Sequence, residues 1–301
     1  MQEKNEKKLL SRRFFCEYYR ENRYICRNEM AMSPCTQKTP PLMTRKLIIA
    51  LTLVLATSLA AKAQTSVQLF YDFGKHLYHK SGPQGNNLSS RYYLTSTVEH
   101  FSADRWGSTF LFTDVYYGNT ARLGAAGGSV GAYWEIGRDF NFWQDSKVGW
   151  LSAHLEYNGG LDTFSGAGTY SDAWLIGPRY SGHSEDFSKT WSVGLYYKTM
   201  PRNAFGSRHS VQLTGVWGLN FCKNMLSFSG FVDVWHENTW FNPDGNITVL
   251  AEPQLWFNFN SLEGAEGVNL SVGTEVELSY NFVGCGPGFY CIPTLALKWT
   301  F

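Results

Sequence analysis

Closely spaced carboxylates are the first residues in this sequence that could carry chemistry. Glu275 and Glu277 stand two positions apart, so in a strand both lie on one face, where one could act as general acid and the other as general base. Such catalysis also needs a nucleophile, a base and an orienting group, and no set of this kind is evident along the chain. We therefore predict that the protein is not an enzyme, that it has no catalytic residue, and that these carboxylates serve structure or selectivity.

Possible metal-binding and redox residues are few. His76 and His79 lie near each other but have no carboxylate or thiol ligand close by in the sequence. The segment GAAGGSVG (124–131) lacks the Lys-Ser/Thr ending of a phosphate-binding loop. Cys285 and Cys291 flank GPGFY and could close a disulfide loop in an oxidising compartment, whereas Cys222 is a lone thiol. We predict no metal and no cofactor, while a bonded and a free state both stay open for Cys285 and Cys291.

Alternation of apolar and polar residues is the pattern that must position these side chains. In residues 268–281, Leu, Val and Tyr alternate with Asn, Ser and Glu, which is the period of a β-strand with one apolar face. The segments that show this period are 66–76, 91–101, 107–117, 129–140, 148–158, 171–180, 190–199, 209–220, 225–237, 248–259, 268–281 and 290–301. They are about twice as long as strands in soluble sheets, roughly 5 to 6 residues, and suit tilted strands that cross a bilayer in roughly 9 to 11.

Ionised side chains lie on the polar face of these strands, and their charge decides whether that face points to lipid or to an interior. A Lys or Arg that faces lipid at the middle of a bilayer costs about 2 to 4 kcal/mol, so the charged face must line an interior. The residues expected to line this lumen and to meet a substrate are Glu99, Asp114, Tyr133, Glu135, Glu156, Tyr196, Lys198, Phe231, Asp233, Trp235, Glu275 and Glu277. We also expect Arg138, Arg179, Glu252 and Lys298 to face inward, with the basic residues pairing with carboxylates.

The last segment, TLALKWTF (294–301), places Leu295, Leu297, Trp299 and Phe301 on one face. An open sheet edge in hydrocarbon leaves backbone groups unpaired at several kcal/mol each, so this strand must pair with the first. The sequence thus predicts an all-β fold, a closed antiparallel transmembrane β-barrel of about 12 strands. Pro253 and Pro293 fall inside predicted strands and mark expected bulges. Long and short connections alternate along the chain, which predicts that both ends of the barrel-forming chain lie on the periplasmic side.

Residues 1–63 precede the predicted barrel domain, 64–301. A basic start, the apolar run 47–61 and an A-x-A motif predict a signal peptide over 43–63, cleaved before Gln64. Residues 1–42 are interpreted as a mis-assigned upstream extension or a disordered segment, and the alternative is a cytoplasmic tail on an uncleaved anchor. Of 26 Lys and Arg residues 12 precede Gln64, and of 25 Asp and Glu residues 5 do, so the remaining 14 and 20 give a net charge of −6. That acidic balance does not suit binding of nucleic acid.

Two resemblances add to this interpretation. The terminal strand resembles the carboxy-terminal signal that the barrel-assembly machinery of Gram-negative bacteria recognises, which implies that machinery as a partner. The stretches that carry the second resemblance are SVQLFYDFG (66–74), RYYLTSTVEHF (91–101), RWGSTFLFTDVYY (105–117), AYWEIGRDFNFW (132–143), HLEYNGG (154–160), NLSVGTEVELS (269–279) and PTLALKWTF (293–301). Together they are similar to an uncharacterised family of outer-membrane proteins grouped with the nucleoside-specific channel-forming (Tsx-type) porins, which are twelve-stranded monomeric barrels. The resemblance implies a monomer in the outer-membrane bilayer but assigns no nucleoside-contacting residue.

Two functions remain open from the sequence. Inward rings such as Tyr133, Tyr196, Phe231 and Trp235 could stack on a planar solute whose polar rim the charged residues hydrogen-bond. This suits a passive channel for small polar solutes such as nucleosides. The same rings could instead fill a plugged lumen, leaving a structural or binding barrel whose extracellular loops meet partners.

Overall fold

Antiparallel strands make up most of the structure, a computed structural model that describes residues 63–118, 127–162 and 172–301. The strands are β1 (Ala63–Asp72), β2 (Leu94–Asp104), β3 (Gly107–Gly118), β4 (Gly128–Phe140), β5 (Leu151–Asp162), β6 (Ala173–His183), β7 (Lys189–Thr199), β8 (His209–Phe221), β9 (Leu226–Glu237), β10 (Asn246–Ala251), β11 (Gln254–Asn258), β12 (Leu270–Tyr280) and β13 (Phe289–Thr300). Short helices α3 (Gly74–Leu77), η2 (Pro83–Gly85) and η3 (Phe259–Ser261) lie in connections. The predicted upstream segment (1–42) lies outside the described residues, as does the predicted signal peptide (43–63) as far as residue 62, so both stay predictions.

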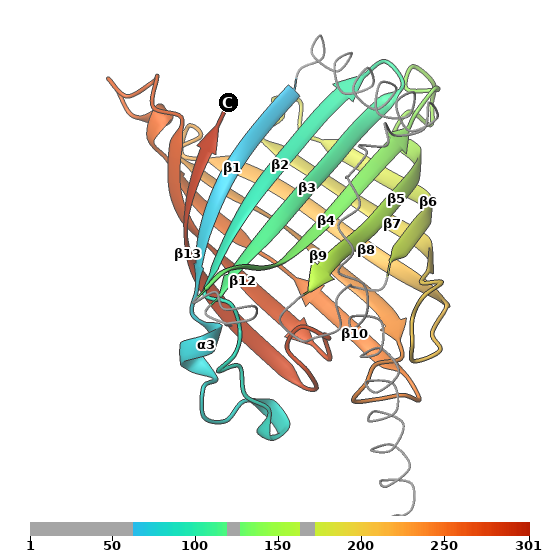
Figure 1. Ribbon diagram of the computed structural model, residues 1–301. Coiled ribbons are helices and arrows are strands. Elements are labelled where there is room, and N and C mark those ends of the chain that lie inside the picture. The colour runs from blue at the N-terminus through green and yellow to red at the C-terminus, as the bar shows by residue number, and fades with distance from the viewer. Residues whose placement is uncertain (1–62, 119–126, 163–171) are drawn as a thin grey trace, which may run out of the picture. The chain divides into compact units, whose positions relative to one another are not determined.

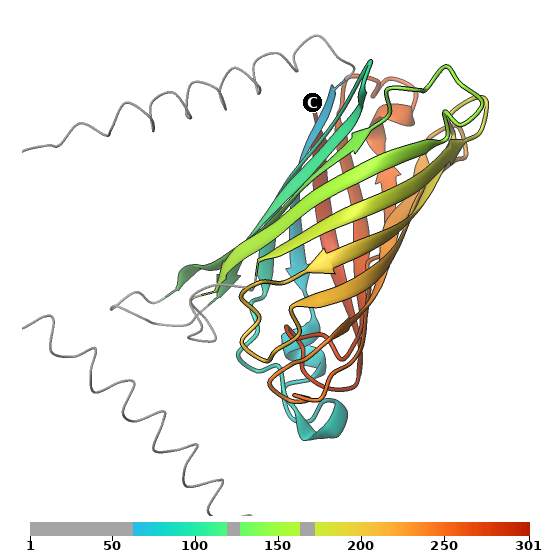
Figure 2. The ribbon, with the colours of Figure 1, turned by 90° about the vertical axis from the view of Figure 1, so that its right-hand side faces the viewer.

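The strands close into one ring. Neighbouring strands are antiparallel, and β13 pairs with β12 on one side and with β1 on the other. The closing ladder runs from Ser66 opposite Thr300 to Asp72 opposite Thr294. The strands form the wall of the barrel and are tilted relative to its axis (Figure 1, Figure 2). The predicted closed antiparallel transmembrane barrel is confirmed.

The wall has twelve strands because β10 and β11 are two halves of one. Both halves pair with β9 and with β12, and the register is the same on either side of the gap at Glu252 and Pro253. Proline has no N–H to donate to the ladder, so the strand is interrupted there. Gly230 of β9 faces the gap with φ 153°, and a Cβ at this position would lie 2.5 Å from the carbonyl oxygen of Glu252.

The bulges predicted at Pro253 and Pro293 are wrong. Strands β12 and β13 also keep one register on both sides of Pro293. Beside it, the hydroxyl of Thr294 accepts a hydrogen bond from the N–H of Glu275 and donates one to the carbonyl of the same residue, both at 3.0 Å. A side chain thus replaces ladder bonds locally without an inserted residue. A register shift occurs instead between β3 and β4, after Tyr116.

The outer face of the barrel is apolar and the inner face is polar. Along β7 and β8, Leu195 and Leu213 are 54% and 48% exposed, whereas Gln212 on the opposite face is 3% exposed. A water-soluble sheet would bury the apolar face, so the outward direction of these side chains is the one expected in lipid. In the described ranges, no helix is long and apolar enough to span a membrane.

The last strand turns its apolar residues outward. Leu295, Leu297, Trp299 and Phe301 are 58%, 48%, 42% and 71% exposed. Ala296, which lies between them on the inner face, is 1% exposed. The predicted outward stripe is therefore present, while its recognition by the assembly machinery stays a prediction.

The two ends of the barrel differ in their connections (Figure 1). The short-turn end carries the start of β1, the end of β13 and the connections 105–106, 141–150, 184–188, 222–225 and 259–269. The long-loop end carries, among others, 73–93, 200–208, 238–245 and 281–288. The predicted alternation of lengths holds only in part, because 141–150 and 259–269 are no shorter than most loops of the opposite end.

The first strand ends at Asp72 rather than at the predicted residue 76. The carboxylate of Asp72 accepts a hydrogen bond from the N–H of Gly74 at 2.7 Å, which turns the chain into α3. A Cβ on Gly74 would lie 3.0 Å from the side chain of Ile292. The lack of a side chain here lets the turn pack against the inner face of β13.

Candidate functional site in the barrel lumen

All twelve residues predicted to line the lumen project from the inner face. Successive strand residues alternate between faces, and each of the twelve occupies a position on the same side of its strand as buried residues such as Gln212 and Ser271. Tyr196, Trp235, Lys198 and Glu277 are only 1%, 6%, 7% and 8% exposed. The structure distributes the twelve over several groups, and their contact with a solute stays a prediction.

The largest group brings carboxylates of β4, β5 and β9 into one region of the lumen. Glu135 accepts a hydrogen bond from the hydroxyl of Tyr133 at 2.7 Å, and Asp233 accepts one from the hydroxyl of Thr214 at 2.5 Å. Glu135 and Glu156 are diagonal neighbours across the β4–β5 pair. The negative charges of Glu156 and Asp233 both repel a charged Glu135 carboxylate. This part of the wall is therefore strongly acidic.

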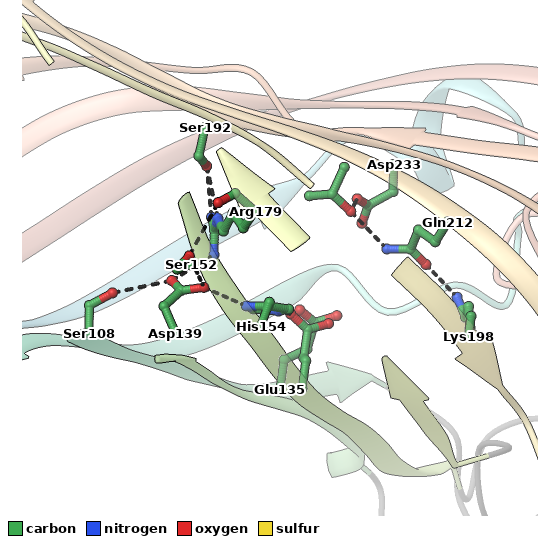
Figure 3. A network of polar contacts seen from close by, with 12 residues as sticks. Ser108, Glu135, Asp139, Ser152, His154, Arg179, Ser192, Lys198, Gln212 and Asp233 are labelled. Carbon is green, nitrogen blue, oxygen red and sulfur yellow. Dashed lines mark hydrogen bonds and ion pairs between the residues drawn. The ribbon is translucent and has the colours of Figure 1, made fainter. Parts of the chain in front are cut away.

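Lys198 is the cation of this acidic region. Its ammonium group donates to the side-chain oxygen of Gln212 at 2.8 Å (Figure 3). The same ammonium lies 4.1 Å from the ring centre of Trp235. Phe231 of β9 lies on the same strand face as Asp233. The predicted inward residues of β7 and β9 thus contribute to one continuous surface.

A second cluster surrounds His154 of β5, which, like Asp139, was not among the residues predicted to line the lumen. The Nδ1 atom of His154 lies 2.8 Å from Asp139 and its Nε2 atom lies 3.1 Å from Glu156. Arg179 contacts the other oxygen of Asp139 at 3.3 Å and donates to the hydroxyl of Ser192 at 3.0 and 2.9 Å (Figure 3). A signal was present, because His and Glu two positions apart share a face of the predicted strand 148–158.

The aromatic ring of Tyr196 closes this cluster. It stacks on the imidazole of His154 with ring centres 4.5 Å apart, and its buried hydroxyl has no hydrogen-bond partner among the described residues. Trp235 is likewise engaged, because Lys198 lies over its ring. With Tyr133, whose hydroxyl donates to Glu135, three of the four aromatic side chains expected to stack on a solute therefore already contact charged or titratable neighbours.

The other predicted carboxylates are paired with neutral donors instead of cations. These pairs are Gln68 with Glu99 (2.9 Å), Thr97 with Asp114 (2.5 Å) and Gln254 with Glu275 (2.6 Å). The expectation that lumen carboxylates pair with basic residues is wrong for these three. It holds for Asp139 with Arg179, and Glu277 pairs with an arginine that was not predicted.

That arginine, Arg91, reaches the inner wall from the connection 73–93 at the long-loop end. Its guanidinium lies 2.6 Å from Glu277 and 3.0 Å from Asp72, and its side chain is 5% exposed. Burial lowers the pKa of Arg91, but the summed attraction of its neighbours, Glu277 first among them, outweighs burial, and the pKa lies well above its ordinary value. Arg91 was missed because loops show no periodic pattern.

Cys285 completes the contacts of Arg91. The thiol donates to Glu277 at 2.9 Å and accepts from Arg91 at 3.3 Å. Burial, followed by the negative charge of Glu277, raises the pKa of the Cys285 thiol well above its ordinary value. Cys291 is exposed and both cysteines are free, so the disulfide that was left open is not formed.

The expectation that Arg138 faces inward is wrong, because its side chain faces outward. It shares the outer face of β4 with Ile136, which is 50% exposed, and its guanidinium lies 2.8 Å from Asp104. Residues 135 and 138 stand three apart, so in a regular strand they cannot share a face. The ion pair with Asp104 lies at the short-turn end of β2 and β4, where a charge need not face the middle of a membrane.

The family of the chain follows from comparison of its sequence. A family model described as "Domain of unknown function (DUF5020)" matches residues 63–301, the whole barrel. The chain belongs to the DUF5020 family. No curated protein matches the sequence significantly.

Solved structures resemble this DUF5020 barrel only remotely. OccK5 (OpdH) of Pseudomonas aeruginosa is 11% identical with a TM-score of 0.36, over 78% of this chain and 62% of that one. LpxR from Salmonella typhimurium is 9% identical with a TM-score of 0.38, over 79% and 100%. The outer membrane channel DcaP of Acinetobacter baumannii is 8% identical with a TM-score of 0.36, over 79% and 96%.

His76 and His79 are the two histidines considered as metal ligands in the DUF5020 chain. Among the described residues, no three His, Cys, Asp or Glu residues are arranged to hold a metal ion. The imidazole of His76 hydrogen-bonds the hydroxyl of Tyr71 at 2.9 Å, and His79 bonds the carbonyl of His76 at 2.8 Å. Both histidines thus serve the fold of the loop.

Acid–base catalysis by His154 would need a free ring nitrogen. Both nitrogens face carboxylates, an arrangement that the doubly protonated imidazolium satisfies. The nearby hydroxyl of Ser152 is directed to Asp139 and to the carbonyl of Arg179. The cluster therefore has the geometry of a charged wall and lacks the Ser-His contact of a hydrolase.

Proposed function

We propose that this barrel is a passive channel of the outer membrane for small polar solutes, and that it is not an enzyme. The observation that carries the proposal is an inner face of carboxylate, amide and hydroxyl side chains beneath an apolar outer face. Such a lining can replace the hydration shell of a polar solute. Because carboxylates outnumber basic residues on the inner face, we expect cations to be favoured over anions.

The outer-membrane location is supported by the exposed apolar stripe of β13 and of the other strands. We propose that the short-turn end faces the periplasm, that a cleaved signal peptide exports the chain, and that the barrel-assembly machinery recognises β13. The closed ring has no free strand edge to pair with another chain, which supports a monomer. The acidic lining does not suit nucleic acid.

Nucleosides are the solute class to test first. The resemblance to Tsx-type porins and the inward rings of Tyr133 and Phe231 support this choice. Tyr196 and Trp235 would have to give up contacts with His154 and Lys198 before they could stack on a base. Tyr133 likewise donates its hydroxyl to Glu135, so Phe231 is the first stacking candidate to test.

A barrel with a plugged lumen is the second candidate, and one observation favours it. Leu175, Trp256, Tyr290 and Ile292 lie on the inner face and are 0% exposed. Such side chains fill interior space that an open channel would leave to water. In that case the loops of the long-loop end would bind partners.

Single-channel recording in planar bilayers separates the two. We expect the folded barrel to give steady current steps in KCl and a reversal potential, under a salt gradient, on the side of potassium. Glu135→Gln combined with Asp233→Asn should reduce the cation preference, while Asp145→Asn in the exposed connection 141–150 should leave it unchanged. Nucleosides should reduce the current. A correctly folded barrel that conducts no ions would overturn the channel proposal in favour of the plugged barrel.

A further inference from the structure

A cavity of about 460 Å³ opens at the short-turn end of the lumen, and we term it the vestibule. Side-chain amides and hydroxyls dominate its lining, which includes Asn220, Asn224, Ser227, Asn258, Asn269 and Ser271. These groups offer both donors and acceptors without net charge. The vestibule is therefore chemically distinct from the acidic region around Glu135.

Two of these amides, those of Asn220 and Asn258, are held in place by a hydrogen-bonded belt across four strands. Ser227 donates to Asn220 at 2.7 Å, Asn258 donates to Ser227 at 2.8 Å, and Ser271 donates to Asn258 at 2.8 Å. The bond to Asn220 uses its oxygen, which leaves its amide N–H groups without a partner among the described residues. A solute in the vestibule would thus meet donors that are already oriented.

Lys298 of β13 adds the positive charge of this cavity. It lies between Gln68 of β1 and Ser271 of β12 in the ladder, and its ammonium group is 4.0 Å from the ring centre of Trp256. With respect to the described residues, the ammonium makes no ion pair and no hydrogen bond. Glu99 attracts it from β2, but that carboxylate accepts a hydrogen bond from Gln68.

Comparison with Lys198 shows that the position of Lys298 is unusual. Both ammonium groups lie over a tryptophan ring at about the same distance, 4.1 and 4.0 Å. Lys198 is 7% exposed and also donates to Gln212, whereas Lys298 lines the vestibule and keeps all three N–H donors for another partner. A partly buried ammonium with free donors is suited to an anion.

One carboxylate at the rim could oppose an anion. Asp186, on the connection 184–188, lines the cavity as well. Its oxygen accepts hydrogen bonds from the hydroxyls of Ser184 at 2.6 Å and Ser188 at 2.8 Å, and these contacts lower the pKa of Asp186 to about 2. Asp186 is fully exposed, so water and salt screen its charge more than that of the ammonium inside.

We propose that the vestibule binds small solutes that carry an anionic group, a carboxylate or a phosphate, with Lys298 as the ion-pairing residue. The amide of Asn220 hydrogen-bonds the uncharged, polar part of the solute. The ring of Trp256 holds the ammonium in position. This inference deepens the proposed function, on which it rests for the passage of solutes, and it places a binding step at the short-turn end, beyond the acidic part of the lumen for a solute that enters from the long-loop end.

Isothermal titration of the purified, folded chain with gluconate, glucose 6-phosphate and glucose tests the site. We expect one or both anions to bind and glucose to bind at least about tenfold more weakly. The tighter anion identifies the preferred group. Lys298→Met should weaken anion binding about tenfold or more, and Lys298→Arg should retain most of it. The matched control is Lys147→Met, an exposed lysine of the connection 141–150 at the same end, which should bind as the wild type does.

Several outcomes would overturn the site. These are equal affinities for glucose and the anions, no binding of either anion, or wild-type affinity in Lys298→Met. If Lys298→Met does not fold, as judged by heat-modifiable migration in electrophoresis, Lys298→Gln takes its place. Current in KCl is recorded separately, so conduction without anion binding refutes the vestibule site alone, and anion binding without conduction refutes the channel alone.

Discussion

At the scale of single residues, the contacts of Arg91 should be the most costly to remove. Arg91→Met leaves the carboxylates of Asp72 and Glu277 buried without a counter-charge, and we expect a loss of about 3 to 5 kcal/mol in the free energy of unfolding. Arg202→Met is the control, because that side chain is 78% exposed in its ion pair with Asp172 and should contribute about 0 to 1 kcal/mol. Denaturant unfolding of the barrel in detergent micelles measures both. Equal losses would show that burial does not govern the Arg91 ion pair.

At the scale of one element, the interruption between β10 and β11 depends on the glycine opposite. Gly230→Ala should destabilise the barrel by about 1 to 3 kcal/mol, because φ 153° is strained for alanine and the new Cβ would meet the Glu252 carbonyl. Gly215→Ala in β8 is the matched change, since its Cβ would meet only Val232, at 3.3 Å. The urea midpoint of each variant is the measurement. A similar midpoint for both variants would mean that the gap relaxes freely.

At the scale of the whole molecule, the apolar outer face should report the depth of each residue in the bilayer. Leu213→Arg, near the middle of β8, should cost about 2 to 4 kcal/mol of unfolding free energy in lipid. Phe221→Arg, on the same face at the short-turn end, should cost about 0 to 1 kcal/mol. Arg138 shows that this rim tolerates an outward arginine when Asp104 is beside it. Unfolding in lipid vesicles gives both values, and a larger loss for Phe221→Arg would contradict the assigned position of the membrane.

The sequence by itself determined the strands, their faces and the need for closure. Residues of a strand alternate between faces, and lipid tolerates neither charge on the outer face nor unpaired backbone at an edge. The predicted segments 107–117, 190–199 and 209–220 therefore match β3, β7 and β8 to within a residue or two. The same alternation placed the twelve lumen candidates on the inner face. The prediction for Arg138 was wrong because this residue is three positions from the inward Glu135, and strict alternation puts it on the outer face.

Only the tertiary structure decided which inward residues meet. His154, Asp139 and Arg179 come from three strands, and Arg91 comes from a loop, so their contacts depend on the register between strands and on how a connection folds back. Periodicity along one strand carries no information on either. For the same reason, two lysines that both alternate inward differ in what surrounds them: the register gives Lys198 a glutamine partner and leaves the donors of Lys298 directed to the vestibule.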